Sequence, residues 1–174
     1  MLQNTPEQFA QQLRDGHFNE LRVALYFMLQ GAFVRIGYTG QSYDLHVLSP
    51  AGRSFSVEVK WDKRAKDTGN LYFEIENTHR QQPSGITATQ ADYWCHVLGD
   101  GQEALLAPVH QLKALLRSRH FRTITTHAAD SNSRGLLVPI AWLQTQSGIV
   151  WIELPTVEAF FGKLFRDTHP RSQP

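Results

Sequence analysis

Three residues of this chain, Asp44, Glu58 and Lys60, are of the types and at the spacing that metal-assisted hydrolysis requires. Glu58 and Lys60 stand two places apart in the segment 54–61, whose β-branched and aromatic residues predict a strand. Side chains alternate across a strand, so both point to the same face. Carboxylate oxygens bind hard divalent cations, and a neighbouring lysine can orient an attacking water molecule. Our hypothesis is a metal site for phosphodiester hydrolysis.

The segment 43–48 is a second run of strand-forming residues, and the Pro and Gly between the two runs predict a β-hairpin that turns near Ala51. In that register Asp44 lies opposite Glu58, with Cβ atoms roughly 4.5–5.5 Å apart. Two facing carboxylates repel each other unless a cation neutralises them, which favours a metal site. The tripeptide alone is weak evidence, because an acid two places before a lysine arises by chance about 0.5 times in such a composition.

The composition is that of a globular protein with one domain. The 174 residues are 41% hydrophobic and 19% charged, and no apolar run is long enough to cross a bilayer. The first seven residues lack the pattern of a signal peptide, so we expect a cytoplasmic protein. The single cysteine, Cys95, excludes an internal disulfide framework and is expected to be a buried small residue. A net charge of +1 means that any positive surface must be local.

The elements that must position these residues begin with two helices. A short helix is expected from Thr5, and after Gly16 a second helix over 18–30, which Gly31 ends. Glu20 lies in the first turn of the second helix. A glutamate there also suits the helix dipole as an exposed charge worth ~0.5 kcal/mol, and taken alone this simpler role is favoured.

Beyond the hairpin the chain alternates between strand, loop and helix patterns. We expect strands at 32–37, 70–77, 93–98, 104–107, 136–140 and 148–154, and helices at 109–119 and 156–165. The connections are a charged segment at 62–67 and polar loops at 78–87 and 118–135, of which the second is expected to be mobile. The tail at 166–174 is expected to be poorly ordered. On the strand 70–77, Glu74 and Glu76 share the polar face. Whether either carboxylate joins the site, or faces solvent as strand glutamates usually do, is left open.

This order of elements resembles the PD-(D/E)xK nuclease superfamily: a helix with Glu20, a strand with Asp44, a strand with Glu58-Val59-Lys60, a further strand and a helix. The resemblance is greatest to phage and archaeal Holliday junction resolvases and to type II restriction endonucleases, and it covers a core at about 17–98, followed by strands and helices at 104–165. It implies an α/β (α+β) fold with a restriction-endonuclease-like core, in which helices flank a central mixed sheet. The superfamily's Pro-Asp dipeptide is here Tyr43-Asp44.

The resemblance also implies roles for the residues that match its motif. Asp44 and Glu58 would bind one or two Mg²⁺ or Mn²⁺ ions, with the backbone carbonyl of Val59 as a further ligand. Lys60 would orient or deprotonate the attacking water, and Glu20 would complete the metal shell.

DNA is the partner that this resemblance implies, held through its phosphates. The residues expected to contact it come from basic or hydroxyl-bearing segments: Lys63, Arg64, Lys66, Arg80, Ser84, Thr87, Lys113 and Arg117. For the basic face of the helix 109–119, a solvated surface is about as good an explanation as a DNA contact.

The function predicted from these features is that of a metal-dependent DNA endonuclease that selects DNA structure, because so short a chain leaves little material for a base-reading domain. A palindromic or four-way substrate would suit a symmetric homodimer. The alternatives are a restriction-type endonuclease, a catalytically inactive nucleic-acid-binding or assembly protein with the same fold, and a structural protein whose hairpin acids form surface ion pairs.

Overall fold

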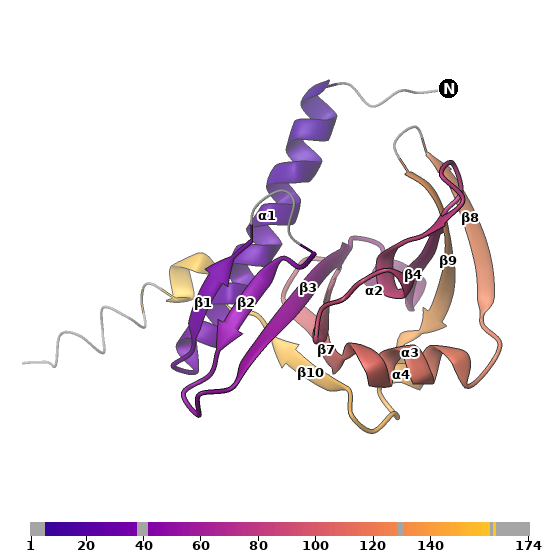
Figure 1. The fold of residues 1–174 in the computed structure, drawn as a ribbon. Helices are drawn as coiled ribbons and strands as arrows, with labels where there is room; N and C mark the ends of the chain where they lie inside the picture. The colour runs from indigo at the N-terminus through magenta and orange to yellow at the C-terminus, as the bar shows by residue number, and fades with distance from the viewer. Residues whose placement is uncertain (1–5, 38–41, 129–130, 161, 163–174) are drawn as a thin grey trace, which may run out of the picture.

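The fold, seen in a computed structural model that describes residues 6–37, 42–128, 131–160 and 162, is built on two β-sheets. The larger sheet has six strands in the order β1-β2-β3-β6-β7-β10, and the smaller has four in the order β5-β4-β9-β8 (Figure 1). The strands of the larger sheet are β1 (Phe33–Ile36), β2 (Leu45–Leu48), β3 (Ser54–Asp62), β6 (Tyr93–Leu98), β7 (Glu103–Pro108) and β10 (Val150–Glu153). The smaller sheet contains β4 (Asn70–Asn77), β5 (Gln82–Pro83), β8 (Arg122–Ala128) and β9 (Ser131–Pro139).

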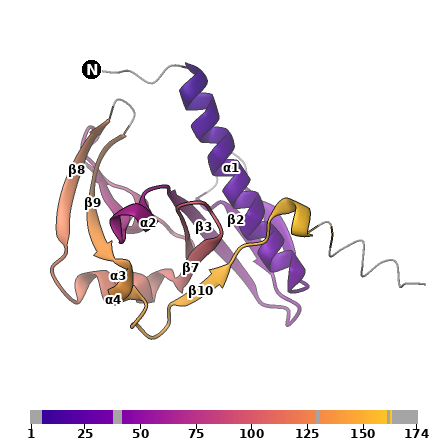
Figure 2. The same ribbon diagram turned by 180° about the vertical axis from the view of Figure 1, so that it is seen from behind.

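The helices are α1 (Pro6–Leu29), α2 (Ala65–Thr68), the 3₁₀ turn η1 (Gly85–Thr87), α3 (Val109–Arg117) and α4 (Ile140–Leu143). α1 covers one face of the larger sheet, where Val23 and Phe27 join a buried cluster with Val57 and Val59 of β3. The other face packs against α3 and the smaller sheet through a second cluster that includes Trp94. Figures 1 and 2 show α1 on one side of β3 and the β8–β9 pair on the other.

The larger sheet is mixed, because β3 pairs antiparallel with β2 and parallel with β6. The expected α+β architecture, a central mixed sheet flanked by helices, is therefore confirmed. β3 is an interior strand, so the alternation of its side chains decides which residues reach each face. Glu58 and Lys60 share one face, as predicted, and it faces the smaller sheet, while Val57 and Val59 are buried on the α1 side.

The predicted hairpin is confirmed in its register. The pairing runs from Leu48–Ser54 to Leu45–Val57, and continuing it by one residue places Asp44 opposite Glu58. Asp44 itself lies just before β2, and its N–H donates to the carbonyl of Val57 at 3.1 Å. The prediction of the hairpin turn followed from local features alone, namely a five-residue connection with Pro and Gly between two strand patterns.

The prediction of two N-terminal helices was wrong, because α1 runs without a break through Gly16. A glycine inside a helix costs about 1 kcal/mol, which packing of the apolar face outweighs. The predicted stop at Gly31 is confirmed: Gly31 has φ +82°, its N–H donates to Met28, and the N–H of Ala32 donates to Phe27. This pair of bonds is the Schellman ending of a helix.

The prediction of a mobile loop over 118–135 was also wrong. Most of this segment forms β8 and the first half of β9, which pair antiparallel with each other. The β-branched residues Thr123, Ile124 and Thr125 favour a strand, and β9 in turn pairs with β4. This pairing also means that β4, correctly predicted at 70–77, belongs to a second sheet instead of extending the first.

The remaining elements lie close to their predicted bounds. α3 is two residues shorter than expected, α4 replaces the end of the strand expected at 136–140, and residues 157–160 are helical. The predicted helix start at Thr5 and the tail at 166–174 lie outside the described residues. No helix in the described part of the chain is long and apolar enough to cross a membrane.

Candidate active site

A cleft of about 380 Å³ opens between the polar face of β3, the strand β4 and the segment that follows β5; we call it the acidic cleft. Its lining residues are Ser42, Tyr43, Asp44, Glu58, Lys60, Glu74, Gly85, Ala88, Thr89 and Gln90. The three residues selected from their spacing in the sequence, Asp44, Glu58 and Lys60, therefore line one cavity. They do so because the hairpin register and the alternation along β3 bring them to one face of the sheet.

Asp44 is fixed at the start of β2 by a hydrogen bond across the hairpin. Its Oδ2 accepts the N–H of Val59 at 2.7 Å. The C=O of a strand residue points to the same side as its N–H, so the Val59 carbonyl also faces the Asp44 side of β3. Burial raises the pKa of Asp44 above its usual value, a shift that the Val59 N–H and Lys60 oppose and that the charge of Glu20 reinforces.

Glu58 and Lys60 form an ion pair in the cleft. The Lys60 Nζ lies 2.7 Å from the Glu58 Oε1, with side-chain exposures of 45% for Lys60 and 15% for Glu58. Burial alone would lower the pKa of Lys60, but Glu58, and then Asp44 and Glu74, raise it overall. The lysine is accordingly held as an ammonium ion, which suits it to orienting a water or stabilising negative charge.

The structure separates Glu74 from Glu76, a distinction that the sequence left open. A β-bulge in β4 shifts its pairing with β9 between these two residues, which breaks the simple alternation. Glu74 lines the acidic cleft, whereas Glu76 forms an ion pair with Arg134 of β9. Glu74 is therefore a carboxylate of the cleft. Strand periodicity could not distinguish it from Glu76, because the bulge depends on the pairing of β4 with β9.

The segment 84–90 closes the cleft opposite Asp44 and is tied to its surroundings by several contacts. Gly85, at φ +53°, approaches β4 so closely that a Cβ there would lie 2.5 Å from the Glu74 carbonyl oxygen. The Thr87 hydroxyl donates to the carbonyl of Ile75 at 2.5 Å, and the Lys113 ammonium donates to the carbonyl of Thr89 at 3.1 Å. Only glycine fits at residue 85 with the backbone in this place.

Glu20 lies near the cleft without lining it. Its carboxylate is 16% exposed and forms a 3.0 Å contact with the Nδ1 of His17 on the same helix. Its charge acts on Asp44, so α1 does bring it toward the hairpin acids. Glu20 is thus near enough for its charge to act on Asp44, but it lies outside the group formed by Asp44, Glu58, Lys60 and Glu74.

The cleft fits a divalent cation by the chemistry of its donors. Within residues 6–37, 42–128, 131–160 and 162, no three Asp, Glu, His or Cys side chains converge as a ready-made metal site. The lining does supply three carboxylates and one ammonium, a net charge of −2 when all are ionised. The Lys60 ammonium pairs with the Glu58 Oε1, and the Val59 N–H donates to the Asp44 Oδ2. The second oxygen of each carboxylate is left to bind a hard cation.

The residues predicted to contact DNA fall into two groups. Arg64, Arg80 and Arg117 are exposed, and Lys63 is exposed while contacting Asp15 at 3.1 Å and the ring of Trp61. The others are engaged within the protein. The Thr87 hydroxyl and the Lys113 ammonium hold the segment 84–90, and the Ser84 Oγ is buried without a hydrogen-bond partner in the described residues.

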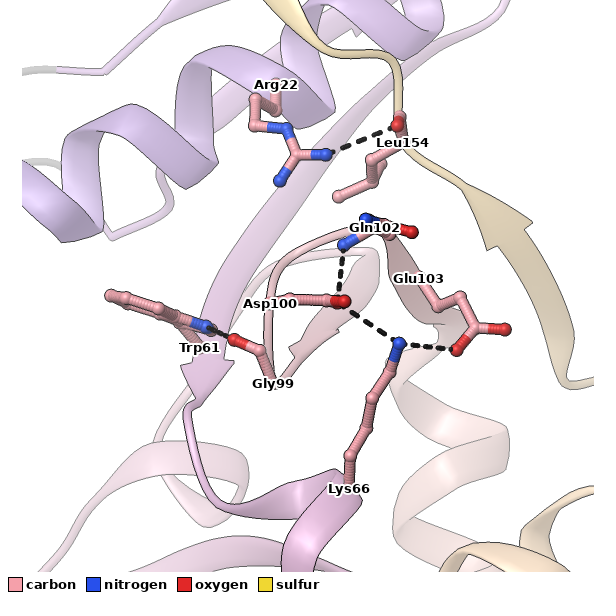
Figure 3. Close-up of polar contacts among 8 residues, drawn as sticks. All are labelled: Arg22, Trp61, Lys66, Gly99, Asp100, Gln102, Glu103 and Leu154. Carbon is pink, nitrogen blue, oxygen red and sulfur yellow. Dashed lines mark hydrogen bonds and ion pairs between the residues drawn. The ribbon is translucent and has the colours of Figure 1, made fainter.

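Lys66 belongs to a polar network on the β6–β7 turn (Figure 3). Its ammonium lies 3.1 Å from Asp100 and 3.0 Å from Glu103, and its stem packs against Gly99. Hydrogen bonds to these two carboxylates raise the pKa of Lys66. Two acidic partners neutralise the lysine, so its place in the structure argues for a structural role rather than for a phosphate contact.

Comparison with known proteins leaves the family of this chain open. No protein-family model matches the sequence, and no curated protein matches it. Among solved structures, the chain is similar to a bacterial homing endonuclease, I-Ssp6803I, with a TM-score of 0.45 and 15% sequence identity over 91% of this chain and 96% of that chain. A similarity at this TM-score carries no conclusion about function.

Proposed function

We propose that the protein is a metal-dependent DNA endonuclease whose active site is the acidic cleft. The observation that carries this proposal is that Asp44, Glu58 and Lys60 line one cavity on the polar face of the mixed sheet. Carboxylates from two adjacent strands, with a lysine two places after the second, form a donor set suited to phosphodiester hydrolysis. The same residues match the PD-(D/E)xK motif by order and spacing.

Asp44, Glu58 and the Val59 carbonyl would hold Mg²⁺ or Mn²⁺, with Glu20, whose charge acts on Asp44, as a further carboxylate. A bound divalent cation supplies charge stabilisation at the phosphate oxygens and lowers the pKa of a bound water. Lys60, kept as an ammonium by its acidic neighbours, orients the attacking water and offsets the negative charge that develops on the phosphate. Its partner Glu58 fixes the direction in which the ammonium points.

Branched DNA is the proposed substrate, with a four-way junction as the first to test. The described elements are committed to the two sheets and the helices that cover them, which leaves no separate base-reading module among the described residues. A junction with two-fold symmetry suits a homodimer that brings one cleft to each of two strands.

A cleavage assay tests the proposal. The protein is incubated with supercoiled plasmid, a linear duplex and a four-way junction in Mg²⁺, Mn²⁺ or EDTA, and products are separated by electrophoresis. We expect nicking or cutting in either metal and none in EDTA, with the junction preferred over the duplex. Binding of these DNAs without cleavage in any metal would instead identify a binding or assembly protein.

Glu74→Gln is expected to lower kcat about 10-fold with a smaller change in KM. The substitution keeps the shape of the side chain and removes one of the carboxylates that act on Lys60 from within the cleft. Glu76→Gln is the matched control, because Glu76 lies two residues along the same strand and pairs with Arg134. Its kinetics should stay within about twofold of wild type. Equal losses in both variants would exclude a specific role for Glu74.

A further inference from the structure

Two further hollows adjoin the acidic cleft, one at each end. The first, which we call the turn hollow, has a volume of about 310 Å³ and shares Lys60 and Glu74 with the cleft. The second, the α3 hollow, has a volume of about 530 Å³ and shares Thr89 and Gln90 with the cleft. The two outer hollows have no lining residue in common. The acidic cleft is thus the middle member of a row of three hollows in which neighbours share lining residues; we call the three together the depression.

Basic side chains line both outer hollows. Lys63 and Arg64 line the turn hollow, and Arg53, His110 and Lys113 line the α3 hollow. Arg53 lies in the β2–β3 turn, far in the sequence from the other two, and was not among the residues predicted to contact DNA. The depression thus has carboxylates at its centre and basic groups at each end, as a site that cleaves a polyanion in its middle requires.

The guanidinium groups of the outer hollows are available to an anion. Arg53 and Arg64 are exposed, and neither side chain forms an ion pair within the described part of the chain. The Lys113 ammonium donates to the Thr89 carbonyl at 3.1 Å and makes a longer contact, at 3.5 Å, with the Thr87 carbonyl. An ammonium has three donors, so Lys113 can still contact a phosphate from the position in which it holds the wall of the cleft.

Apart from Glu74, which the turn hollow shares with the cleft, each outer hollow contains one carboxylate, and that carboxylate accepts hydrogen bonds from protein donors. In the α3 hollow, the Asp92 Oδ2 accepts the N–H and the hydroxyl of Ser56 at 2.8 and 2.9 Å. In the turn hollow, Asp62 accepts the backbone N–H groups of Arg64 and Tyr72 at 3.0 and 2.9 Å. These bonds offset the negative charge locally, so the unpaired arginines remain the groups that an approaching anion meets.

We propose that the three hollows form one track for a nucleic-acid strand, in which the α3 hollow binds a phosphate on one side of the cleaved bond and the turn hollow binds a phosphate on the other. The proposal rests on the endonuclease function for the meaning of the central cleft. It adds Arg53 and His110 to the substrate-binding surface and assigns Arg64 to the opposite end. Lys66, tied to Asp100 and Glu103, lies outside the track.

The test is the salt dependence of DNA binding in EDTA, measured by fluorescence anisotropy with a labelled duplex and a labelled four-way junction. The variants are Arg53→Gln and Arg64→Gln, with Arg35→Gln as the matched control. Arg35 is an exposed arginine on the edge strand β1 that lines none of the three hollows. All three substitutions remove one surface charge and should leave the thermal unfolding temperature unchanged.

Arg53→Gln and Arg64→Gln are each expected to raise Kd roughly 3- to 10-fold near 0.1 M salt and to reduce the slope of log Kobs against log salt by about 0.7–0.9. Arg35→Gln should leave both quantities within error of wild type. Wild-type affinity and slope in Arg53→Gln, or an equal loss in Arg35→Gln, would overturn the track.

Cleavage in Mg²⁺ by the same preparations separates this proposal from the endonuclease function. If the wild type cuts no DNA but Arg53→Gln and Arg64→Gln still weaken binding selectively, the track stands and the endonuclease function fails. If the wild type cuts and Arg53→Gln binds and cuts as well as wild type, the function stands and the track fails. A wild-type protein that binds neither DNA also overturns the track.

Discussion

Replacing Glu58 by glutamine is expected to lower the rate of metal-dependent DNA cleavage by about 10²–10³-fold, the largest effect that the acidic cleft predicts. Glu58 has two roles in the proposed mechanism. It would be a metal ligand, and it holds the Lys60 ammonium at 2.7 Å. Glutamine has nearly the same shape but no charge, so the variant loses both functions without a change in packing.

DNA binding in EDTA distinguishes this loss from unfolding. Glu58→Gln removes a negative charge from the centre of the depression, so its affinity for DNA should equal or exceed that of the wild type. The measurement is the initial rate of junction or plasmid cutting in Mg²⁺ at saturating protein, with Glu76→Gln as the surface control. Undiminished cutting by Glu58→Gln would mean that the acidic cleft is not the active site.

A second large effect is expected on the stability of the fold below neutral pH, and it comes from His96. This histidine is 1% exposed in β6, where the Trp94 Nε1 donates to its Nδ1 at 3.3 Å and the ring of Phe73 packs edge-on against it. Burial, helped by the positive charge of Lys60, lowers the pKa of His96 to about 3. The imidazole is therefore almost entirely neutral in the folded protein at pH 4.5 and above.

The unfolded chain takes up a proton at this histidine near its ordinary pKa of about 6.5, and the folded chain does not. Stability contributed by the neutral imidazole is thus complete above pH ~6.5 and falls as the pH drops toward 3. At pH 4.5 the loss is about 2.7 kcal/mol, since each unit below 6.5 costs about 1.4 kcal/mol.

Urea unfolding of the wild type and of His96→Gln between pH 7 and 4.5 measures this contribution. The difference in unfolding free energy between the two proteins should shrink by about 2.7 kcal/mol over that range, because the variant has no imidazole to protonate. His110→Gln, at an exposed position of α3, controls for the loss of one histidine. A constant difference between the wild type and His96→Gln would show that His96 gains a proton in the folded state.

The parts of the fold that could be predicted from the sequence are those that neighbouring residues determine. The β2–β3 hairpin follows from alternation and a Pro- and Gly-containing turn, and its register brings Asp44 opposite Glu58. Helix α1 ends at Gly31, where a left-handed residue is needed. Each of these features depends on contacts within a few residues, so composition and spacing are enough to locate them.

The parts that could not be predicted depend on partners distant in the chain. Residues 122–128 looked like a loop because they are polar, but pairing with β9 makes them a strand. The bulge that directs Glu74 into the cleft and Glu76 toward Arg134 exists only because β9 lies beside β4. Arg53 likewise gains its proposed role only when α3 packs close to the β2–β3 turn.

The two walls of the acidic cleft are held by hydrogen bonds between residues at different separations in the sequence. These separations predict the order in which the bonds form during folding. The Asp44–Val59 bond links residues 15 apart, the Ser56–Asp92 bonds that join β3 to β6 link residues 36 apart, and the Tyr72–Ser133 bond between β4 and β9 spans 61. The entropic free-energy cost of loop closure is about 1.2 kcal/mol higher for the Tyr72–Ser133 bond than for the Asp44–Val59 bond.

Non-local strand pairing is correspondingly slow, so Asp44, Glu58 and Lys60 should come together in the hairpin before Glu74 arrives on the second sheet. Pulsed hydrogen exchange during refolding would then protect the Val59 amide, which is bound to Asp44, earlier than the Thr78 amide, which donates to the carbonyl of Asn132 in β9. The reverse order would contradict this pathway. On this pathway the chain assembles its central acids as a local unit and encloses them last.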